Sequence, residues 1–150
     1  MISRTLVQMI QDHAEKITAR IIRKQRLDPE LAHTAKLPEA ELESLAEEVL
    51  RSLGRCLDAG GTGENARRWE RFGRLRFEEG IPLSEVVRSL HIVRETLVDY
   101  VREQGVGQSA VELYAEEELE HMLGLYFDNA VYHAVRGYEG LMRRAASIAC

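Results

Sequence analysis

Apolar residues recur along the chain at intervals of three and four positions, and strict alternation of apolar and polar residues is nearly absent. This spacing places apolar side chains on one face of an α-helix, so it predicts amphipathic helices rather than strands. The first such stretch starts after Ser3, a residue type that commonly caps helices. It reaches about Arg26, because the pair Asp28-Pro29 stops a helix. We therefore expect one helix over residues 3–26.

The middle of the chain continues the same pattern. Pro38 stands where a second helix would begin, since proline is well tolerated at the first helical position. The segment 60–63 holds three glycines in four residues and should end that helix. A third helix is predicted over roughly residues 64–79.

The last third of the chain predicts two further long elements. A fourth helix starts at Pro82 and Ser84 and is broken at Gly105. Ser109 then caps a long final helical stretch, and Gly124 is the position at which it can bend or divide into two helices. The pattern as a whole predicts an all-α bundle of five to six helices with a long C-terminal helix, and a globin-like arrangement is one option for it.

Composition adds limits on size and location. The 150 residues fit one domain, 1–150, and the balance of 45% apolar and 30% charged residues is that of a globular protein. The 20 basic and 25 acidic residues give a net charge of −5, which argues against nonspecific binding of nucleic acid. Two cysteines make no disulfide framework, and no apolar run is long enough to cross a bilayer. We expect a cytoplasmic protein without membrane insertion.

Two sequence motifs have the spacing of carboxylate-bridged metal sites. Glu118 and His121 form one Glu-x-x-His pair, and Glu30 and His33 form another. Such motifs must project into a bundle core, whereas Glu30 follows Pro29 in a connector and Glu118 lies in a run of carboxylates typical of a solvated face. No histidine clusters with cysteine as in a zinc site. No metal centre is expected.

Haem binding depends on one histidine. His91 borders the apolar stripe of the fourth predicted helix, between Leu90 and Ile92, and a proximal haem ligand must point into an apolar pocket. The ordinary alternative is a partly buried histidine at the edge of the core, which we favour. We therefore expect no cofactor, with haem near His91 as the alternative.

Catalytic motifs are absent from the sequence. It contains no nucleophile elbow, phosphate-binding glycine loop or dinucleotide-binding fingerprint. Cys56 lies on or near the inner stripe of the second predicted helix, where a small buried thiol is the usual reading. An enzyme is not expected.

The third predicted helix is unusually rich in arginine. Such a run can grip an anion or an acidic partner. The simpler reading, which we favour, is a solvated face that nearby glutamates neutralise. The five arginines within ten residues are Arg67, Arg68, Arg71, Arg74 and Arg76.

Small residues recur at steps of three and four along the last helix. A glycine inside a helix costs about 1 kcal/mol relative to alanine, so close packing must offset it. Two explanations stay open at this point: packing within the chain, or the interface of a homodimer. The candidate interface residues are Ala130, Ala134, Gly137, Leu141 and Ala145. The segment 141–150 carries no glycine or proline stop, which suggests either a following domain or a partner helix.

The stretch from Trp69 to Tyr100 carries a family resemblance. Phe72-Gly73-x-x-Arg76, the segment 79–86 (EGIPLSEV) and Leu90-x-x-Val93-Arg94 resemble the RsbRD-type N-terminal domain. That domain occurs in RsbT co-antagonist (stressosome) proteins and in some bacterial sensor histidine kinases. The resemblance implies an all-helical sensory domain, distantly globin-like, usually without haem and commonly dimeric, followed by a STAS or kinase output module.

These observations together lead to a functional expectation. The chain is expected to be a non-catalytic bacterial input domain that relays a signal through its C-terminal helix and dimer contacts to an output domain or partner. The alternative is a haem-binding or small-ligand sensor with a pocket near His91. The candidate ligand-binding residues are Trp69, Phe72, Arg76, His91 and Arg94.

Overall fold

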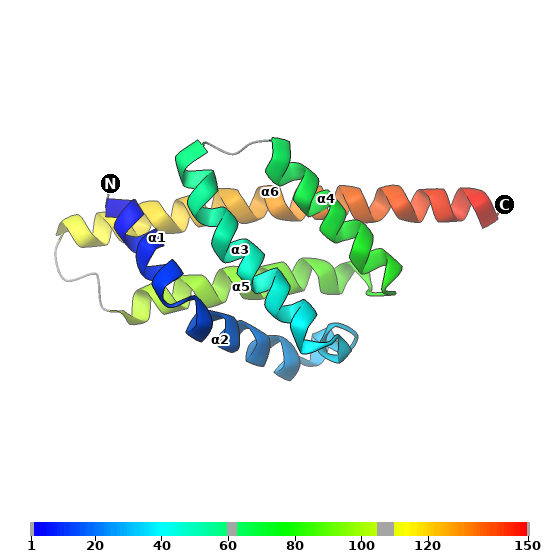
Figure 1. Ribbon diagram of the computed structural model, residues 1–150, viewed down its shortest axis with the longest axis horizontal. Helices are drawn as coiled ribbons and strands as arrows, with labels where there is room; N and C mark the ends of the chain where they lie inside the picture. The colour runs from blue at the N-terminus through cyan, green and yellow to red at the C-terminus, as the bar shows by residue number, and fades with distance from the viewer. Residues whose placement is uncertain (1, 60–62, 105–109, 150) are drawn as a thin grey trace.

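Helices account for all regular secondary structure in the described part of the chain (Figure 1). The computed structural model describes residues 2–59, 63–104 and 110–149. The all-α prediction with a long C-terminal helix is confirmed. The α-helices are α1 (Ile2–Asp12), α2 (Ala14–Leu27), α3 (Glu39–Ala59), α4 (Gly63–Glu78), α5 (Leu83–Glu103) and α6 (Ala110–Ala149), and two 3₁₀ turns, η1 (Pro29–Leu31) and η2 (Thr34–Lys36), join α2 to α3.

The single helix predicted over residues 3–26 is wrong, because the chain breaks at His13. The backbone of His13 leaves the helical region at φ −109° and ψ 23°. Its ring Nδ1 lies 2.8 Å from the Met9 carbonyl oxygen, which also accepts a hydrogen bond of 3.2 Å from the His13 backbone N–H. The change of direction lets α1 pack on α3 and α6, while α2 packs on α3 and α5.

A buried carboxylate fixes the connector between α2 and α3. Glu85, in the first turn of α5, accepts hydrogen bonds from the Thr34 backbone N–H at 2.9 Å, the Thr34 hydroxyl at 2.9 Å and the His33 N–H at 3.1 Å. Burial by itself would raise the pKa of Glu85, but these bonds and the His33 ring outweigh it and hold the pKa below its usual value. The two 3₁₀ turns are therefore anchored to the start of α5.

The turn between α4 and α5 follows the sequence signals closely. Gly80 has φ +76°, a left-handed conformation that glycine adopts without a steric penalty. The Gly80 N–H bonds to the Phe77 carbonyl and the Ile81 N–H to the Arg76 carbonyl, both at 3.0 Å. This pair of hydrogen bonds is typical of a helix C-terminus and ends α4. Pro82 is then the N-cap residue of α5.

The last helix is one continuous element. It contains 40 residues, so it is about 60 Å long at the usual rise per residue. Gly124 does not divide it, contrary to one expectation from the sequence. In Figure 1 α6 runs across the whole molecule, and its C-terminal end projects beyond the other helices. The predicted cap Ser109 lies outside the described residues.

The apolar faces of the helices meet in one core. All six helices contribute to a single cluster of buried side chains. None of the described helices combines the length and the apolar character that a membrane span requires. The largest fully buried apolar side chains are those of Ile10, Ile17, Ile21, Leu31, Leu42, Leu90, Leu97, Leu119, Leu123 and Phe127.

Candidate functional site

The α4 helix lies directly on α6. A Cβ atom added at Gly73 would overlap the Ala134 carbonyl oxygen, and one added at Gly137 would overlap the Glu70 carbonyl oxygen. The two backbones therefore touch at two points, and α4 with α6 is the most extensive helix pairing in the described chain. The Tyr138 hydroxyl also donates a hydrogen bond of 2.7 Å to the Ile81 carbonyl just after α4.

This packing decides between the two explanations for the small-residue seam. Ala130 and Ala134 are fully buried within the chain, and Gly137 is buried against α4. These three residues are therefore not available to a second copy, and their assignment to a dimer interface is wrong. Leu141 is half-buried, and only Ala145 is exposed.

An aromatic cluster joins α4 to α6 at the level of the pocket described below. Trp69 is 3% exposed and meets Phe72 edge to face at 5.5 Å between ring centroids. It meets Tyr126 of α6 in the same way at 6.2 Å. Edge-to-face geometry is the preferred arrangement of aromatic rings, so these contacts fix the position of Trp69.

A pocket of about 230 Å³ opens between α3 and α4. It is somewhat smaller than the roughly 300–1,000 Å³ of typical small-molecule sites. Three residues named from the sequence, Trp69, Phe72 and Arg76, meet at this pocket. The remaining lining residues are Glu41, Ser44, Leu45, Glu48 and Ser52 of α3, and Asn65, Arg68, Arg71 and Leu75 of α4.

One ion-pair cluster lies at the Arg76 side of the pocket. The Arg76 side chain is buried and donates to the Glu79 carboxylate at 2.6 Å and to the Glu41 carboxylate at 3.2 Å. Its guanidinium also stacks over the Phe72 ring at 4.9 Å. The pKa of Glu41 is raised, mainly by its hydrogen bond with Glu79 and secondly by burial, and Arg76 acts in the opposite direction. Arg76 therefore pairs with two carboxylates while its guanidinium packs on the Phe72 ring.

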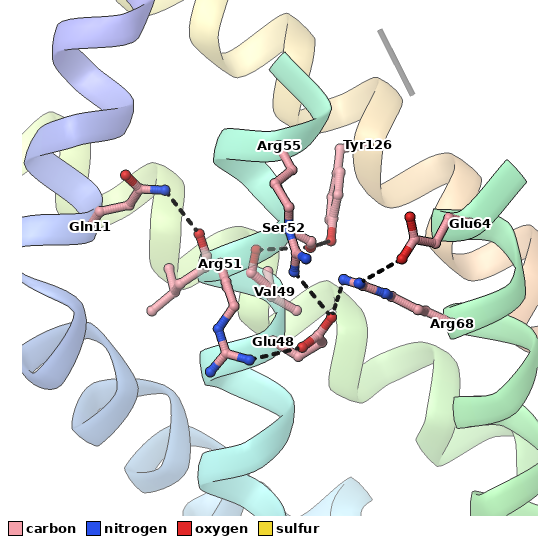
Figure 2. A network of polar contacts seen from close by, with 10 residues as sticks. Gln11, Glu48, Val49, Arg51, Ser52, Arg55, Glu64, Arg68 and Tyr126 are labelled. Carbon is pink, nitrogen blue, oxygen red and sulfur yellow. Dashed lines mark hydrogen bonds and ion pairs between the residues drawn. The ribbon is translucent and has the colours of Figure 1, made fainter. Parts of the chain in front are cut away.

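A second cluster is centred on Glu48 and is drawn in Figure 2. The Glu48 carboxylate lies 2.7 Å from the Arg68 guanidinium, and Arg68 also contacts Glu64 at 3.0 Å. Two further arginines of α3, Arg51 and Arg55, contact the same carboxylate at 3.5 and 3.7 Å. This network connects α3 to α4 across the second side of the pocket.

The pocket also contacts α6 directly. The Ser52 hydroxyl of α3 forms a hydrogen bond with the Tyr126 hydroxyl (Figure 2). Trp69 contacts the same tyrosine from α4. The buried indole N–H of Trp69 has no acceptor within the described residues, which is uncommon for a buried donor. Tyr126 thus receives a contact from each wall of the pocket.

Two of the residues proposed from the sequence lie elsewhere. His91 is exposed on α5 and does not line this pocket. An exposed imidazole does not fit the role of a proximal haem ligand, so the proposed pocket near His91 is not supported. Arg94 is half-buried, and its guanidinium faces Gly124 and lies 3.8 Å from the Asp128 carboxylate.

The candidate metal motifs do not converge either. His33 places its Nδ1 2.6 Å from the Glu85 carboxylate, and Glu30 and His121 are exposed. Among the described residues no three acidic, histidine or cysteine side chains are grouped as metal ligands. The side chain of Cys56 lies outside the described part.

The α3 wall of the pocket was missed by the sequence reasoning. Its polar members recur at three- and four-residue steps, so they share one helix face beside the apolar stripe. The periodic spacing of these polar residues was the available signal in the sequence. Spacing along one helix does not identify the helix that packs against it. The missed residues are Glu41, Ser44, Glu48 and Ser52.

Comparison with known proteins assigns the family. Residues 12–148 match the family described as the RsbT co-antagonist protein rsbRD N-terminal domain. The chain belongs to this family. The match contains α2 to α5, most of α6 and the whole α3–α4 pocket, and it associates the domain with stressosome-related signalling. Searches of the curated proteins and of the solved structures returned no match, so a globin-like arrangement stays a prediction.

Proposed function

We propose that the chain is a non-catalytic bacterial input domain, which relays a change at the α3–α4 pocket through α6 to an output module or partner protein. One observation carries this proposal. The α4 helix lines the pocket with Trp69 and Phe72, and it lies backbone to backbone on α6 at Gly73 and Gly137. A movement of α4 is therefore transmitted to α6 without a flexible intermediate.

Tyr126 offers a specific route for the relay. A small molecule entering the pocket, or a stress that repacks it, displaces Trp69 or Ser52, and both contact Tyr126. Close-packed interfaces respond to such displacements by switching between discrete arrangements rather than by deforming continuously. The small-ligand alternative is thus better supported at this pocket than near His91.

The output end of the relay is the second half of α6. Residues 142–148 are exposed, and they include the apolar side chains Met142 and Ile148. We place the contact with a STAS-type or kinase-type output module or partner there. A cytoplasmic location and the absence of nucleic-acid partners belong to the same proposal, supported by composition.

The proposal is tested by filling the pocket. Ser44 is exposed and lines the pocket, so Ser44→Trp adds a ring at its mouth without altering the core. We expect hydrogen exchange to change in α6 between residues 126 and 138 as well as in α3 and α4. Ser84→Trp, at an exposed position of α5 away from the pocket, is the matched control. Changes confined to α3 and α4 would contradict the relay.

A further inference from the structure

A second groove lies between α4 and the C-terminal half of α6. It has a volume of about 320 Å³, within the range of small-ligand sites. It is separate from the α3–α4 pocket, and the two share no lining residue. Its lining residues are Glu70, Arg74, Arg136, Gly137, Gly140, Leu141 and Arg144.

The three arginines of this groove, like Arg67 and Arg71 of α4, have no carboxylate partner among the described residues. Arg68 and Arg76 of α4 are paired with carboxylates, and so is Arg143 of α6. In contrast, Arg74 and Arg144 form no ion pair with any described carboxylate, and Arg136 contacts only the Tyr132 ring, at 5.9 Å. Three guanidinium groups therefore border one groove that a single carboxylate, Glu70, also lines.

The lining of the groove holds three arginines against one carboxylate, Glu70. Glu70 accepts a hydrogen bond of 3.1 Å from Nδ1 of His133. The groove therefore has an excess of positive charge, in a domain whose net charge is −5. Such a local excess attracts an anion rather than a basic partner.

Gly140 provides independent support, because packing within the chain does not explain it. Gly137 is required by its contact with the Glu70 backbone, whereas a Cβ atom at Gly140 would meet nothing within 4 Å. A glycine inside a helix costs about 1 kcal/mol relative to alanine, so an uncompensated one is unexpected. Arg136, Gly140 and Arg144 are spaced by four residues, which places the glycine between the two arginines on one face of α6.

We propose that this groove binds a small molecule bearing a phosphate or diphosphate group. The planar guanidinium fork matches pairs of phosphate oxygens, and three such groups can share one dianion. Gly140 leaves space for the phosphate between Arg136 and Arg144, while Arg74 reaches it from α4. Leu141 offers an apolar contact for the remainder of the ligand. Because both helices contribute, a bound anion would hold α4 against α6.

Calorimetric titration with pyrophosphate, at low ionic strength, tests this proposal. We expect Arg136→Gln and Arg144→Gln each to weaken binding by about tenfold or more, since each removes charge-assisted hydrogen bonds. Arg143→Gln removes the same charge from the same helix outside the groove and should change the affinity less than about twofold. Gly140→Leu should abolish binding while the circular dichroism spectrum and the thermal midpoint stay at or above the wild-type values.

Four outcomes would overturn the proposal. They are no pyrophosphate binding at about 10 mM, an equal loss in Arg143→Gln, unchanged binding in folded Gly140→Leu, and citrate binding as tightly as pyrophosphate. The last outcome would indicate a general polyanion site rather than a phosphate site. None of these results bears on the relay from the α3–α4 pocket, so the two proposals fail independently.

Discussion

At the scale of single residues, glycines inside the helices have different physical roles. Gly73 and Gly137 each occupy a position where a Cβ atom would overlap the backbone of the facing helix. Gly140 lies three residues after Gly137 on the same helix, yet a Cβ atom there would have open space around it. The difference comes from the crossing point of α4 and α6, which covers one glycine and not the other.

This contrast gives a matched pair of substitutions. Gly137→Ala should lower the free energy of unfolding by about 3 kcal/mol, because the backbone of α4 must move away from α6. Gly140→Ala should raise it by about 0.5–1 kcal/mol, because alanine favours the helix and meets no neighbour. Urea titration followed by circular dichroism measures both. Equal effects of the two substitutions would contradict the close α4–α6 contact.

Glu85 predicts how stability depends on pH. Its pKa is lowered in the folded chain from an ordinary value near 4.5. The ionised carboxylate therefore stabilises the fold above about pH 4.5, and this contribution is lost as the pH falls through the lowered pKa. Glu85→Gln should cost about 1–3 kcal/mol at pH 7 and less at pH 3.5. Urea unfolding at the two pH values is the measurement.

The exposed Glu78→Gln is the control for this prediction. It removes a carboxylate that is not buried, so it should leave the pH dependence of the wild type almost unchanged. A Glu85→Gln variant with the same loss at both pH values would show that the hydrogen bonds around Thr34 do not depend on the carboxylate charge.

At the scale of elements, prolines and glycines determined where several helices begin and end. Pro38 and Pro82 directly precede α3 and α5, as the sequence predicted, and Gly80 closes α4. The break at His13 was not predicted, because histidine carries no helix-stopping signal. The sequence also did not determine that α6 continues through Gly124 as one helix. Packing on neighbouring helices decided both cases.

The two halves of α6 should differ in local stability. Between residues 115 and 138 the helix repeatedly buries side chains, whereas residues 142–148 are exposed. Amides without tertiary contacts exchange through local fraying, so we expect those of 142–148 to exchange at least about 100 times faster than those of 126–138. Hydrogen exchange with mass spectrometry measures this ratio. Equal protection in the isolated chain would indicate that a partner already covers the end of α6.

At the scale of the whole molecule, the small-residue seam is used internally and a different face of α6 remains open. Tyr114, Leu125 and Tyr132 are 73%, 58% and 57% exposed. At 100° per residue they lie within about 20° of one another around the helix axis, opposite the buried face. Exposed Glu118, His121 and Asp128 lie near the same face, so the three apolar side chains are spaced along it rather than joined in one patch. We propose that the homodimer contact expected from the sequence lies on this outer face of α6, with a second copy of the chain as the occupant.

The dimer contact can be tested by adding charge to this outer face. The double variant Leu125→Glu with Tyr132→Glu should shift a dimer to a monomer, because it introduces like charges opposite each other across the interface. Leu113→Glu alters an exposed apolar residue of α6 outside this face and should leave the mass unchanged. Analytical ultracentrifugation gives the masses. A wild-type monomer at high concentration would overturn this homodimer proposal.

The sequence by itself determined the helical class, the long last helix, the turn at residues 80–82 and the family, because these depend on local periodicity, on proline and glycine, and on a contiguous motif. Three of the five candidate ligand-binding residues, Trp69, Phe72 and Arg76, also met at one pocket. Only the tertiary structure decided that α3 forms the opposite wall, that His91 faces outward and that Gly137 serves α4 rather than a second copy. Helix periodicity fixes which residues share a face, but the partner of that face is set by how distant helices cross, and that information is not local.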